Sequence, residues 1–411
     1  MTTRERLISL AQWLAGGTAV GLLSGLASAL FLWLLDRATL LRMHHEVLVY
    51  GLPAAGLVMG WAFGRFGTSI KGGASLVIDR LHEGGPEIPV RMAPMVLAGT
   101  VLTHLFGGSA GREGTAVQMG ASLADFFSHR LRLSARLRRD LLAAGVAGGF
   151  GSVFGTPIAG AVFGLEFVVL GRIEYRALVP ALVAAVVGDM TTRGVGIVHT
   201  AYPSAPTVAL TAVLLAKWLV FAAAVAGTTT AFIELVSRLK RLAERFVPNA
   251  ALRMALGGAV LVVMWRGSGT SDFLGLGIPT IVRAFDDPTL ASFTFAAKLL
   301  FTAVTLAAGF LGGEVTPLFF VGAALGNLMA GVLGIPLPLG AAVGMAGVFA
   351  AASNTPLALS IMAVELVGGG ALPHVGIVCV LAYLMTGHRS IYPAQRLVGG
   401  KAGRDSIGNA P

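Results

Sequence analysis

The chain has 411 residues, of which 55% are hydrophobic and 12% are charged, and its mean hydropathy is +0.80. An ordinary soluble domain carries roughly 25% charged residues, so this composition excludes a soluble fold and predicts a membrane protein. The 30 Lys and Arg exceed the 20 Asp and Glu, which gives a net charge of +10. Such an excess is typical of the cytoplasmic loops of polytopic membrane proteins, and nucleic acid is not needed to explain it.

Apolar runs without charge predict where the chain enters the membrane, because about 20 such residues span a bilayer. They are Leu7–Leu35, Val47–Gly64, Met92–Gly111, Leu141–Leu165, Gly194–Ala216, Val315–Val364 and Leu366–Gly387. No cleavage-type site closely follows the first run, so we expect it to be retained as a membrane segment. Prolines and glycines interrupt Val315–Val364, which predicts short, discontinuous helices that are buried in protein or face a polar cavity.

Clusters of basic residues indicate which ends of these segments face the cytoplasm. The clusters are Arg4/Arg6, Arg130–Arg139, Arg238–Arg245 and Arg389–Arg404. We therefore expect a multi-pass protein of the inner (plasma) membrane with both termini in the cytoplasm. Too little chain follows Arg404 to form a soluble regulatory domain, so residues 1–411 are expected to form a single transmembrane domain.

An internal repeat divides the chain into two halves, with an offset of roughly 200 residues. The matched segments are Phe154–Glu166 with Ser353–Glu365, Gly111–Thr115 with Gly312–Thr316 and, more weakly, Gly73–Ile78 with Gly277–Val282. We expect a first repeat over residues 7–205 and a second over 206–400, in an all-α fold of two inverted repeats built from tilted, discontinuous helices. In transporters built this way the substrate site lies at the interface of the repeats.

Glu113 and Glu314 stand at matched places in two glycine-rich motifs, Gly111-Arg112-Glu113-Gly114-Thr115 and Gly312-Gly313-Glu314-Val315-Thr316-Pro317. Both motifs predict helix N-termini in or near the bilayer, where unpaired N–H donors and a partial positive charge favour an anion. Two such N-termini can face one anion. A carboxylate at membrane depth is costly and usually functional. The alternative is that each glutamate only caps its own helix.

Several other polar residues have both a functional and a structural interpretation. Thr115 and Thr316 lie two residues after the glutamates, and each hydroxyl either donates to a bound anion or bonds back to the backbone. Arg112 either neutralises Glu113 or forms a salt bridge in the wall. Tyr392 begins the last basic stretch, where an aromatic residue ordinarily lies at the membrane interface. A surface or interhelical role is expected for two further acids, Glu166 and Glu365.

The sequence contains no pattern for a metal, cofactor or nucleotide. His104 and the pair His44-His45 lack the spaced partners of a metal site. The glycine-rich stretch Gly107–Gly114 lacks the Gly-Lys-Ser/Thr ending of a phosphate-binding loop, which argues against ATP as the driver. Ser109 follows His104 at a short spacing, so an intramembrane hydrolase stays as a remote alternative.

With these motifs in place, the chain resembles the CLC family of anion channels and proton-coupled antiporters over nearly its whole length. The resemblance rests on Gly111–Gly114, Gly312–Pro317, the paired helices led by Pro157 and Pro356, and Tyr392. It implies a secondary active transporter or channel rather than an enzyme, and a homodimer in the lipid bilayer with one anion pathway per subunit. It also implies a gating role for Glu113, which matches the glutamate that competes with the anion, and places Tyr392 at the inner end of the pathway.

Departures from the chloride-transporting pattern resemble the bacterial fluoride-exporting branch of that family. Thr115 stands where chloride members usually have proline, Lys71–Ser75 replaces the anion-binding serine motif, and Phe167 stands where an inner proton-transfer glutamate is expected. In the fluoride branch, the residues that match Glu314 and Thr316 lie at the centre of the pathway.

These features predict a fluoride/proton antiporter that exports fluoride and confers fluoride resistance, with Glu113 as the gate and Glu314 as a central carboxylate. The expected anion-binding residues are Gly111, Arg112, Gly114, Thr115, Gly313, Val315, Thr316 and Tyr392. Fluoride is small and strongly hydrated, so it requires several aimed donors to leave water. A chloride/proton antiporter or a chloride channel of the same family is the main alternative.

Overall fold

The computed structural model describes residues 3–83, 87–170 and 175–397. The basic cluster beyond Leu397, including Arg404, and the last residues of the expected second repeat lie outside this part. The described residues form an almost entirely helical fold with one short parallel strand pair, β1 (Val169–Leu170) and β2 (Arg396–Leu397).

The helices are α1 (Thr3–His44), η1 (Glu46–Gly51), α2 (Leu52–Phe66), η2 (Thr68–Ile70), α3 (Ala74–Glu83), α4 (Met92–Leu105), α5 (Glu113–Arg130), α6 (Ala135–Phe154), α7 (Pro157–Glu166), η3 (Tyr175–Ala177), α8 (Leu178–Gly194), α9 (Ala212–Phe246), α10 (Ala250–Ser268), α11 (Ile278–Arg283), α12 (Thr294–Ala308), α13 (Val315–Leu333), α14 (Leu337–Ser353), α15 (Pro356–Val367), η4 (Gly369–Ala371) and α16 (Leu372–Met385), where η marks a 3-10 helix.

Within the described residues, six helical stretches are long and apolar enough to cross a membrane. They are α1, η1 with α2, η3 with α8, α9, α10 and α13. The predicted interruptions of Val315–Val364 are confirmed, because this run forms α13, α14 and α15 with breaks at Gly334–Pro336 and Asn354–Thr355. The prediction of a membrane segment over Gly194–Ala216 is wrong: α8 ends at Gly194, and no helix begins before Ala212.

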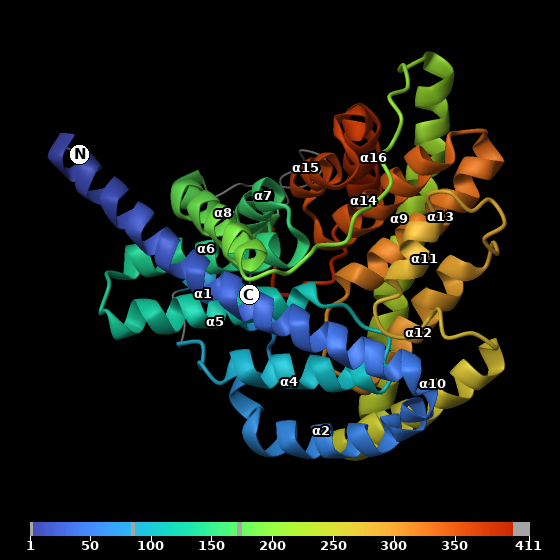
Figure 1. Cartoon of the computed structure of the whole chain (residues 1–411), viewed down its shortest axis with the longest axis horizontal. Coiled ribbons are helices and arrows are strands. Elements are labelled where there is room, and N and C mark those ends of the chain that lie inside the picture. The colour runs from blue at the N-terminus through green and yellow to red at the C-terminus, as the bar shows by residue number, and fades with distance from the viewer. Residues whose placement is uncertain (1–2, 84–86, 171–174, 398–411) are drawn as a thin grey trace, which may run out of the picture.

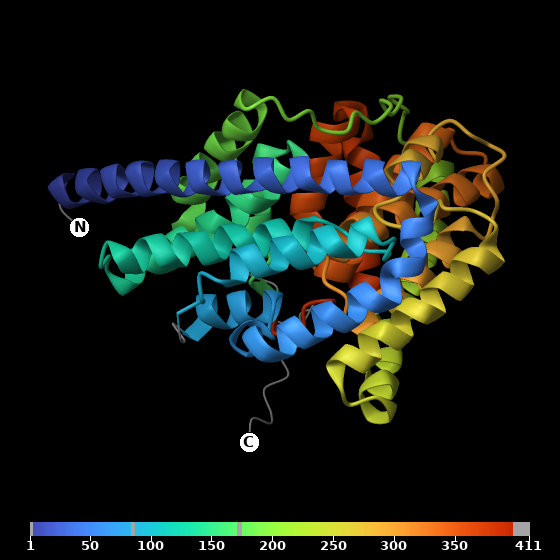
Figure 2. The ribbon, with the colours of Figure 1, turned by 60° about the horizontal axis from the view of Figure 1, so that its bottom comes forward.

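The helices of the two halves of the chain lie side by side. In Figure 1, α5 to α8 lie on the left and α9 to α14 on the right, while α1 runs diagonally across the view, and α2 packs on α10 at the lower edge. Figure 2 shows α1 running along the molecule, with its N-terminal end projecting beyond the other helices. This arrangement brings the matched motifs of the two halves toward a common centre.

Glycine contacts hold the two helices that begin at these motifs. In the first half, a Cβ on Gly120 of α5 would lie 2.2 Å from the carbonyl oxygen of Gly145 on α6. In the second half, a Cβ on Gly322 of α13 would lie 2.2 Å from the carbonyl oxygen of Gly344 on α14. Only glycine permits these close approaches, because any side chain would clash with the neighbouring backbone. The starts of α5 and α13 are therefore fixed against closely packed neighbours.

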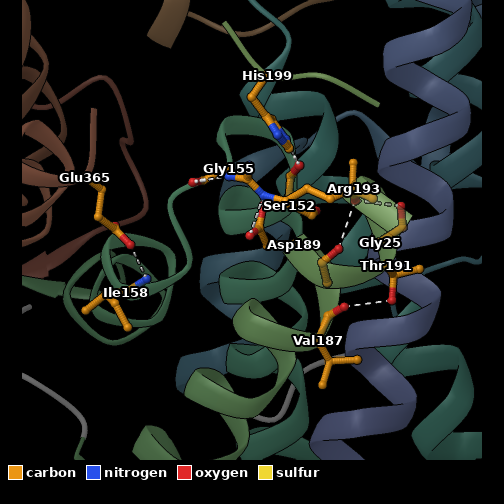
Figure 3. Close-up of polar contacts among 12 residues, drawn as sticks. Gly25, Ser152, Gly155, Ile158, Val187, Asp189, Thr191, Arg193, His199 and Glu365 are labelled. Atoms are coloured by element: carbon orange, nitrogen blue, oxygen red, sulfur yellow. Dashed lines mark hydrogen bonds and ion pairs between the residues drawn. The ribbon is translucent and has the colours of Figure 1, made fainter. Parts of the chain in front are cut away.

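The connection between α8 and α9, residues 195–211, is tied to α6 by polar contacts. The His199 Nε2 lies 2.9 Å from the carbonyl oxygen of Ser152, as Figure 3 shows. Arg193, at the end of α8, donates to the Asp189 carboxylate and to the carbonyl oxygen of Gly155. Gly155 has a φ of +75°, and a Cβ there would meet both His199 and Arg193. The segment is thereby held over the C-terminal end of α6.

Candidate functional site

The two glycine-rich motifs pair with each other through their backbones. The Gly111 N–H donates to the Gly313 carbonyl at 2.6 Å, and the Gly313 N–H donates to the Gly111 carbonyl at 2.8 Å. This antiparallel bridge places the first residues of α5 and α13 next to each other, because each helix begins within two residues of it. Two helix N-termini, with their unpaired N–H donors, thus lie at one place in the interior.

Glu113 inserts its carboxylate into the N-terminus of the other helix. The side chain is fully buried, and its carboxylate accepts hydrogen bonds from both the backbone N–H (3.1 Å) and the hydroxyl of Thr316 in the first turn of α13. The backbone N–H of Arg112 also donates to it at 3.0 Å, and the Arg112 Nε lies 3.5 Å away. The carboxylate therefore joins the two helix starts: it accepts from the Arg112 N–H before α5 and also occupies the anion-favouring N-terminus of α13.

Glu314 immediately precedes α13 and is partly buried. Its side chain makes no capping hydrogen bond to α13, so the interpretation that it only caps its own helix does not describe this geometry. Lys240, near the end of α9, lies within electrostatic range of its carboxyl group. The two central carboxyl groups thus differ: Glu113 is held by several donors, and Glu314 is not held by the helix that it precedes.

Tyr392 is only 6% exposed and packs its ring edge-on against Phe167, with 4.7 Å between the ring centroids. Its phenol lies within electrostatic range of both Glu314 and Glu113. Gln395 fixes this region by donating from Nε2 to the carbonyl oxygens of Phe167 and Ser353, each at 2.8 Å. Sequence reasoning missed Gln395, since an isolated amide in a basic stretch carries no recognisable pattern.

The remaining predicted residues surround the bridge in different ways. Thr115 is buried, and its hydroxyl pairs with that of Thr100 at 2.7 Å, so it faces α4 in this structure. Gly114 is packed on Gly313, since a Cβ on Gly114 would lie 3.2 Å from the Gly313 Cα. Val315 is buried at the start of α13. The predicted residues therefore do converge, with the Thr115 hydroxyl turned to a second polar group.

The geometry gives no support to hydrolase chemistry at Ser109. The Ser109 hydroxyl pairs with the Thr302 hydroxyl at 2.9 Å. Both ring nitrogens of His104 instead face carbonyl oxygens, those of Thr100 at 2.8 Å and Ala110 at 2.9 Å. These groups therefore brace the turn before Gly111 rather than forming a Ser–His pair. Across residues 3–83, 87–170 and 175–397, no cluster of His, Cys, Asp and Glu has the arrangement of a metal site.

Similar proteins of known name or structure share this architecture. A protein from Pseudomonas syringae pv. tomato, named a chloride/fluoride channel protein, is 44% identical over 94% of this chain and 87% of its own length. The crystal structure of a CLC-type fluoride/proton antiporter matches with a TM-score of 0.92 and 35% identity, covering 97% of this chain and all of that one. The structure of a slow cyanobacterial Cl⁻/H⁺ antiporter, at 18% identity and a TM-score of 0.80, shows the shared fold alone.

The family described as "Voltage gated chloride channel" matches residues 55–387. This match covers most of the chain, and it agrees with the resemblance that the motifs at Gly111 and Gly312 carry. The all-helical fold with discontinuous helices, expected from the sequence, is confirmed by the structural neighbours. The chain therefore belongs to the voltage gated chloride channel (CLC) family of membrane transport proteins.

Proposed function

We propose that this chain is a fluoride/proton antiporter that exports fluoride from the cytoplasm and confers fluoride resistance. The observation that carries the proposal is the position of the Glu113 carboxylate on the amide and hydroxyl of Thr316. A carboxylate oxygen and a fluoride ion are both small and strong hydrogen-bond acceptors, so donors arranged for one are suited to the other. The similarity to a protein described as a CLC-type fluoride/proton antiporter also supports it.

The proposed exchange alternates the two anions at one set of donors. Protonation of Glu113 from outside removes its charge and weakens its hydrogen bonds to Thr316 and to the Arg112 N–H. Fluoride then takes these donors. The protonated Glu113 side chain later gives its proton to the inside, and the ionised carboxylate returns to the donors and displaces fluoride. Inward movement of protons therefore drives fluoride out, and no cofactor or nucleotide takes part.

Glu314 and Tyr392 are proposed to serve the inner part of the pathway. Phe167 occupies the place where chloride antiporters carry a further glutamate, so an inner proton acceptor must come from elsewhere. Glu314 lies within range of both the Tyr392 phenol and Lys240. It would hold fluoride as a neutral donor or pass the proton on, while the phenol donates a hydrogen bond to the anion.

The test is transport in liposomes with simultaneous fluoride and pH measurement. We expect the wild type to take up protons while it releases fluoride, and Glu113→Gln to lose this proton coupling because the amide cannot ionise. Glu244→Gln is the matched control, since Glu244 is an exposed glutamate near the end of α9. Proton uptake that persists unchanged in Glu113→Gln would refute the gate assignment.

A chloride/proton antiporter or chloride channel is the second candidate, because the relative from Pseudomonas syringae is named for both chloride and fluoride. The same vesicles separate the two candidates when they are loaded with equal fluoride and chloride. Release of fluoride well ahead of chloride supports the proposal. Equal release, or release of chloride alone, supports the alternative.

We also propose a homodimer in the inner membrane, with both termini in the cytoplasm and one pathway in each subunit. The packed helices α7, α8, α15 and α16 carry the exposed side chains Ile158, Leu182, Leu357 and Leu372. Such a set is suited to pairing with a second copy in the bilayer. Cross-linking in native membranes between copies that carry a single introduced cysteine, at position 158 or at position 357, tests the dimer. Labelling of cysteines placed near each terminus tests the orientation.

A further inference from the structure

A cavity of about 720 Å³ lies over Arg112, whose Nε is 3.5 Å from the buried Glu113 carboxylate. The end of α1, residues 196–200 and residues 271–280 form its walls. Of the residues proposed above to bind the transported anion, only Arg112 lines it. It is therefore separate from the site at Thr316 but adjoins the residue before Glu113.

Arg42 in the last turn of α1 lines this cavity and is only 6% exposed. Among the described residues, its buried Nε has no hydrogen-bond partner. Glu46 acts on it only at longer range. A buried cation is strongly unfavourable unless an acceptor replaces its lost hydration. The α1 C-terminus offers a partial negative charge but makes no such bond.

A second buried basic side chain lies near Arg42. The fully buried Lys298 of α12 lies within electrostatic range of Arg42, and its Nζ donates to the carbonyl oxygens of Phe273 and Gly275. Both acceptors are backbone carbonyl groups, so Lys298 brings no acidic partner to Arg42. The inner wall of the cavity therefore carries Arg42 and Arg112, and a buried basic side chain lies beside Arg42.

Two acids also line the cavity, and neither faces Arg42 as an ion-pair partner. Asp272 lies 3.7 Å from Arg283, which is exposed on α11. Asp36 is exposed and lies six residues before Arg42 on α1. The two acids thus belong to the solvent side of the cavity. Of the two deeper guanidinium groups, Arg112 faces the Glu113 carboxylate, whereas Arg42 has no ion-pair partner among the described residues.

We propose that this cavity is a second anion site, in which the Arg42 guanidinium, together with Arg112, binds a small inorganic anion that keeps part of its water shell. A water molecule takes about 30 Å³, so the volume admits a halide with several waters. The inference rests on the proposed function and assigns this site to the transported halide. On the face of the protein where α1 ends, the transported ion would bind at this site and regain its water shell before it is released.

Thermal unfolding of the detergent-solubilised protein in sodium fluoride and in sodium gluconate tests binding without transport. All variants in this experiment also carry Thr316→Val, so that fluoride binding at the central site contributes less to the change in Tm. Fluoride should raise the Tm in this background, and adding Arg42→Gln should raise the fluoride concentration for the half-maximal shift about tenfold. Arg42→Lys should retain part of the response, and Arg37→Gln, an exposed arginine on the same helix, should retain all of it.

Two results of this experiment would overturn the proposal. One is an unchanged fluoride response in Arg42→Gln. The other is a clear drop of its Tm in gluconate, which would show that Arg42 stabilises the fold through protein contacts. We expect instead an unchanged or higher Tm in gluconate, because the substitution removes a buried charge without a partner.

Transport separates this inference from the proposed function. With the wild type exchanging fluoride for protons, Arg42→Gln should raise about tenfold the fluoride concentration that half-saturates transport from the face where α1 ends, with the exchange ratio unchanged. An unchanged half-saturating concentration would overturn the second site and leave the antiporter intact. A wild type that moves no protons with fluoride would refute the antiporter, while the Tm response would still report on Arg42.

Discussion

Glu166 and Glu365 each accept two backbone hydrogen bonds from the first turn of the helix that the other glutamate ends or nearly ends. Glu166 of α7 accepts from the N–H groups of α15 at 3.1 and 2.8 Å, and Glu365 of α15 accepts from those of α7 at 3.0 and 2.8 Å. Figure 3 shows the contact of Glu365 with Ile158. The expected interhelical role of these glutamates is thereby confirmed. Each carboxylate stabilises the positive end of its neighbour, so the two helices pack antiparallel.

Because these two contacts lie at opposite ends of the helix pair, we expect their loss to be additive. Glu166→Gln and Glu365→Gln should each lower the free energy of unfolding by about 1–2 kcal/mol, since a neutral amide accepts more weakly and brings an unsatisfied N–H. The contacts are about 15 Å apart along ten residues of helix, beyond the usual range of coupling. Unfolding of both single variants and the double variant in detergent measures this. A double variant that is no less stable than either single variant would contradict the expected additivity.

The bridge between Gly111 and Gly313 predicts a strong effect of a single added methyl group. A Cβ on Gly111 would lie 2.9 Å from both the Glu113 Oε2 and the Pro317 Cδ, so Gly111→Ala must displace the gate or α13. We expect a loss of about 1–3 kcal/mol of stability and of most fluoride flux. Gly331→Ala on α13 is the control, because its Cβ would meet nothing within 4 Å. Equal flux in both variants would show that the close approach at Gly111 is dispensable.

Tyr392→Phe separates the phenol from the ring. The ring contact with Phe167 remains in this variant, so the Tm should change little. Loss of a hydrogen bond to a charged acceptor should lower fluoride transport about tenfold, whereas chloride flux, if present, should fall less because chloride accepts more weakly. Flux of both ions in matched vesicles checks this. If Tyr392→Phe transports fluoride as fast as the wild type, the phenol does not bind fluoride in the pathway.

The sequence predicts the repeated helix starts well, because motifs such as Gly111–Thr115 and Gly312–Thr316 carry local signals for glycine turns and N-termini. It also predicts the breaks before Leu337 and Pro356, where glycine, asparagine and proline end one helix and start the next. The prediction over Gly194–Ala216 fails because absence of charge is not a helix signal. The α9 helix was missed as a span because Lys217 and Glu234 interrupt its apolar run.

Contacts between the two halves of the chain cannot be predicted from such local sequence signals. The pairing of Gly111 with Gly313, and of Glu113 with Thr316, joins residues roughly 200 positions apart, so only the three-dimensional packing reveals that the carboxylate enters the opposite helix. Arg42 is another example. In the sequence it is a basic residue at a helix end, which is ordinarily solvated, and its burial follows from segments far along the chain.

His199, in the connection between α8 and α9, predicts a pH dependence of stability. Burial lowers the pKa of His199 from 6.5, against the opposing hydrogen bond to the Ser152 carbonyl and the charge of Asp189. A lowered pKa means that the unfolded chain binds the proton more readily, so stability is complete above about pH 6.5 and declines as the pH falls below it. His199→Gln should flatten the Tm profile between about pH 7 and 5. An identical profile would assign the dependence to other groups.

Thr316 offers the sharpest test of the central site, because its amide and hydroxyl have separable roles. Thr316→Val keeps the shape and the backbone N–H but removes the hydroxyl that donates to Glu113, whereas Thr316→Ser keeps the hydroxyl and loses only a methyl group. If the hydroxyl replaces part of the fluoride hydration shell, the valine variant should transport fluoride about tenfold more slowly, and the serine variant should stay close to the wild type. Both variants should retain the fold, since Thr316 is buried and the changes are small. Initial rates of fluoride efflux under a fixed proton gradient, with proton uptake recorded in the same vesicles, compare them. Equal rates for valine and serine would mean that the backbone amides at the start of α13 suffice, and that the Thr316 hydroxyl serves only to hold Glu113.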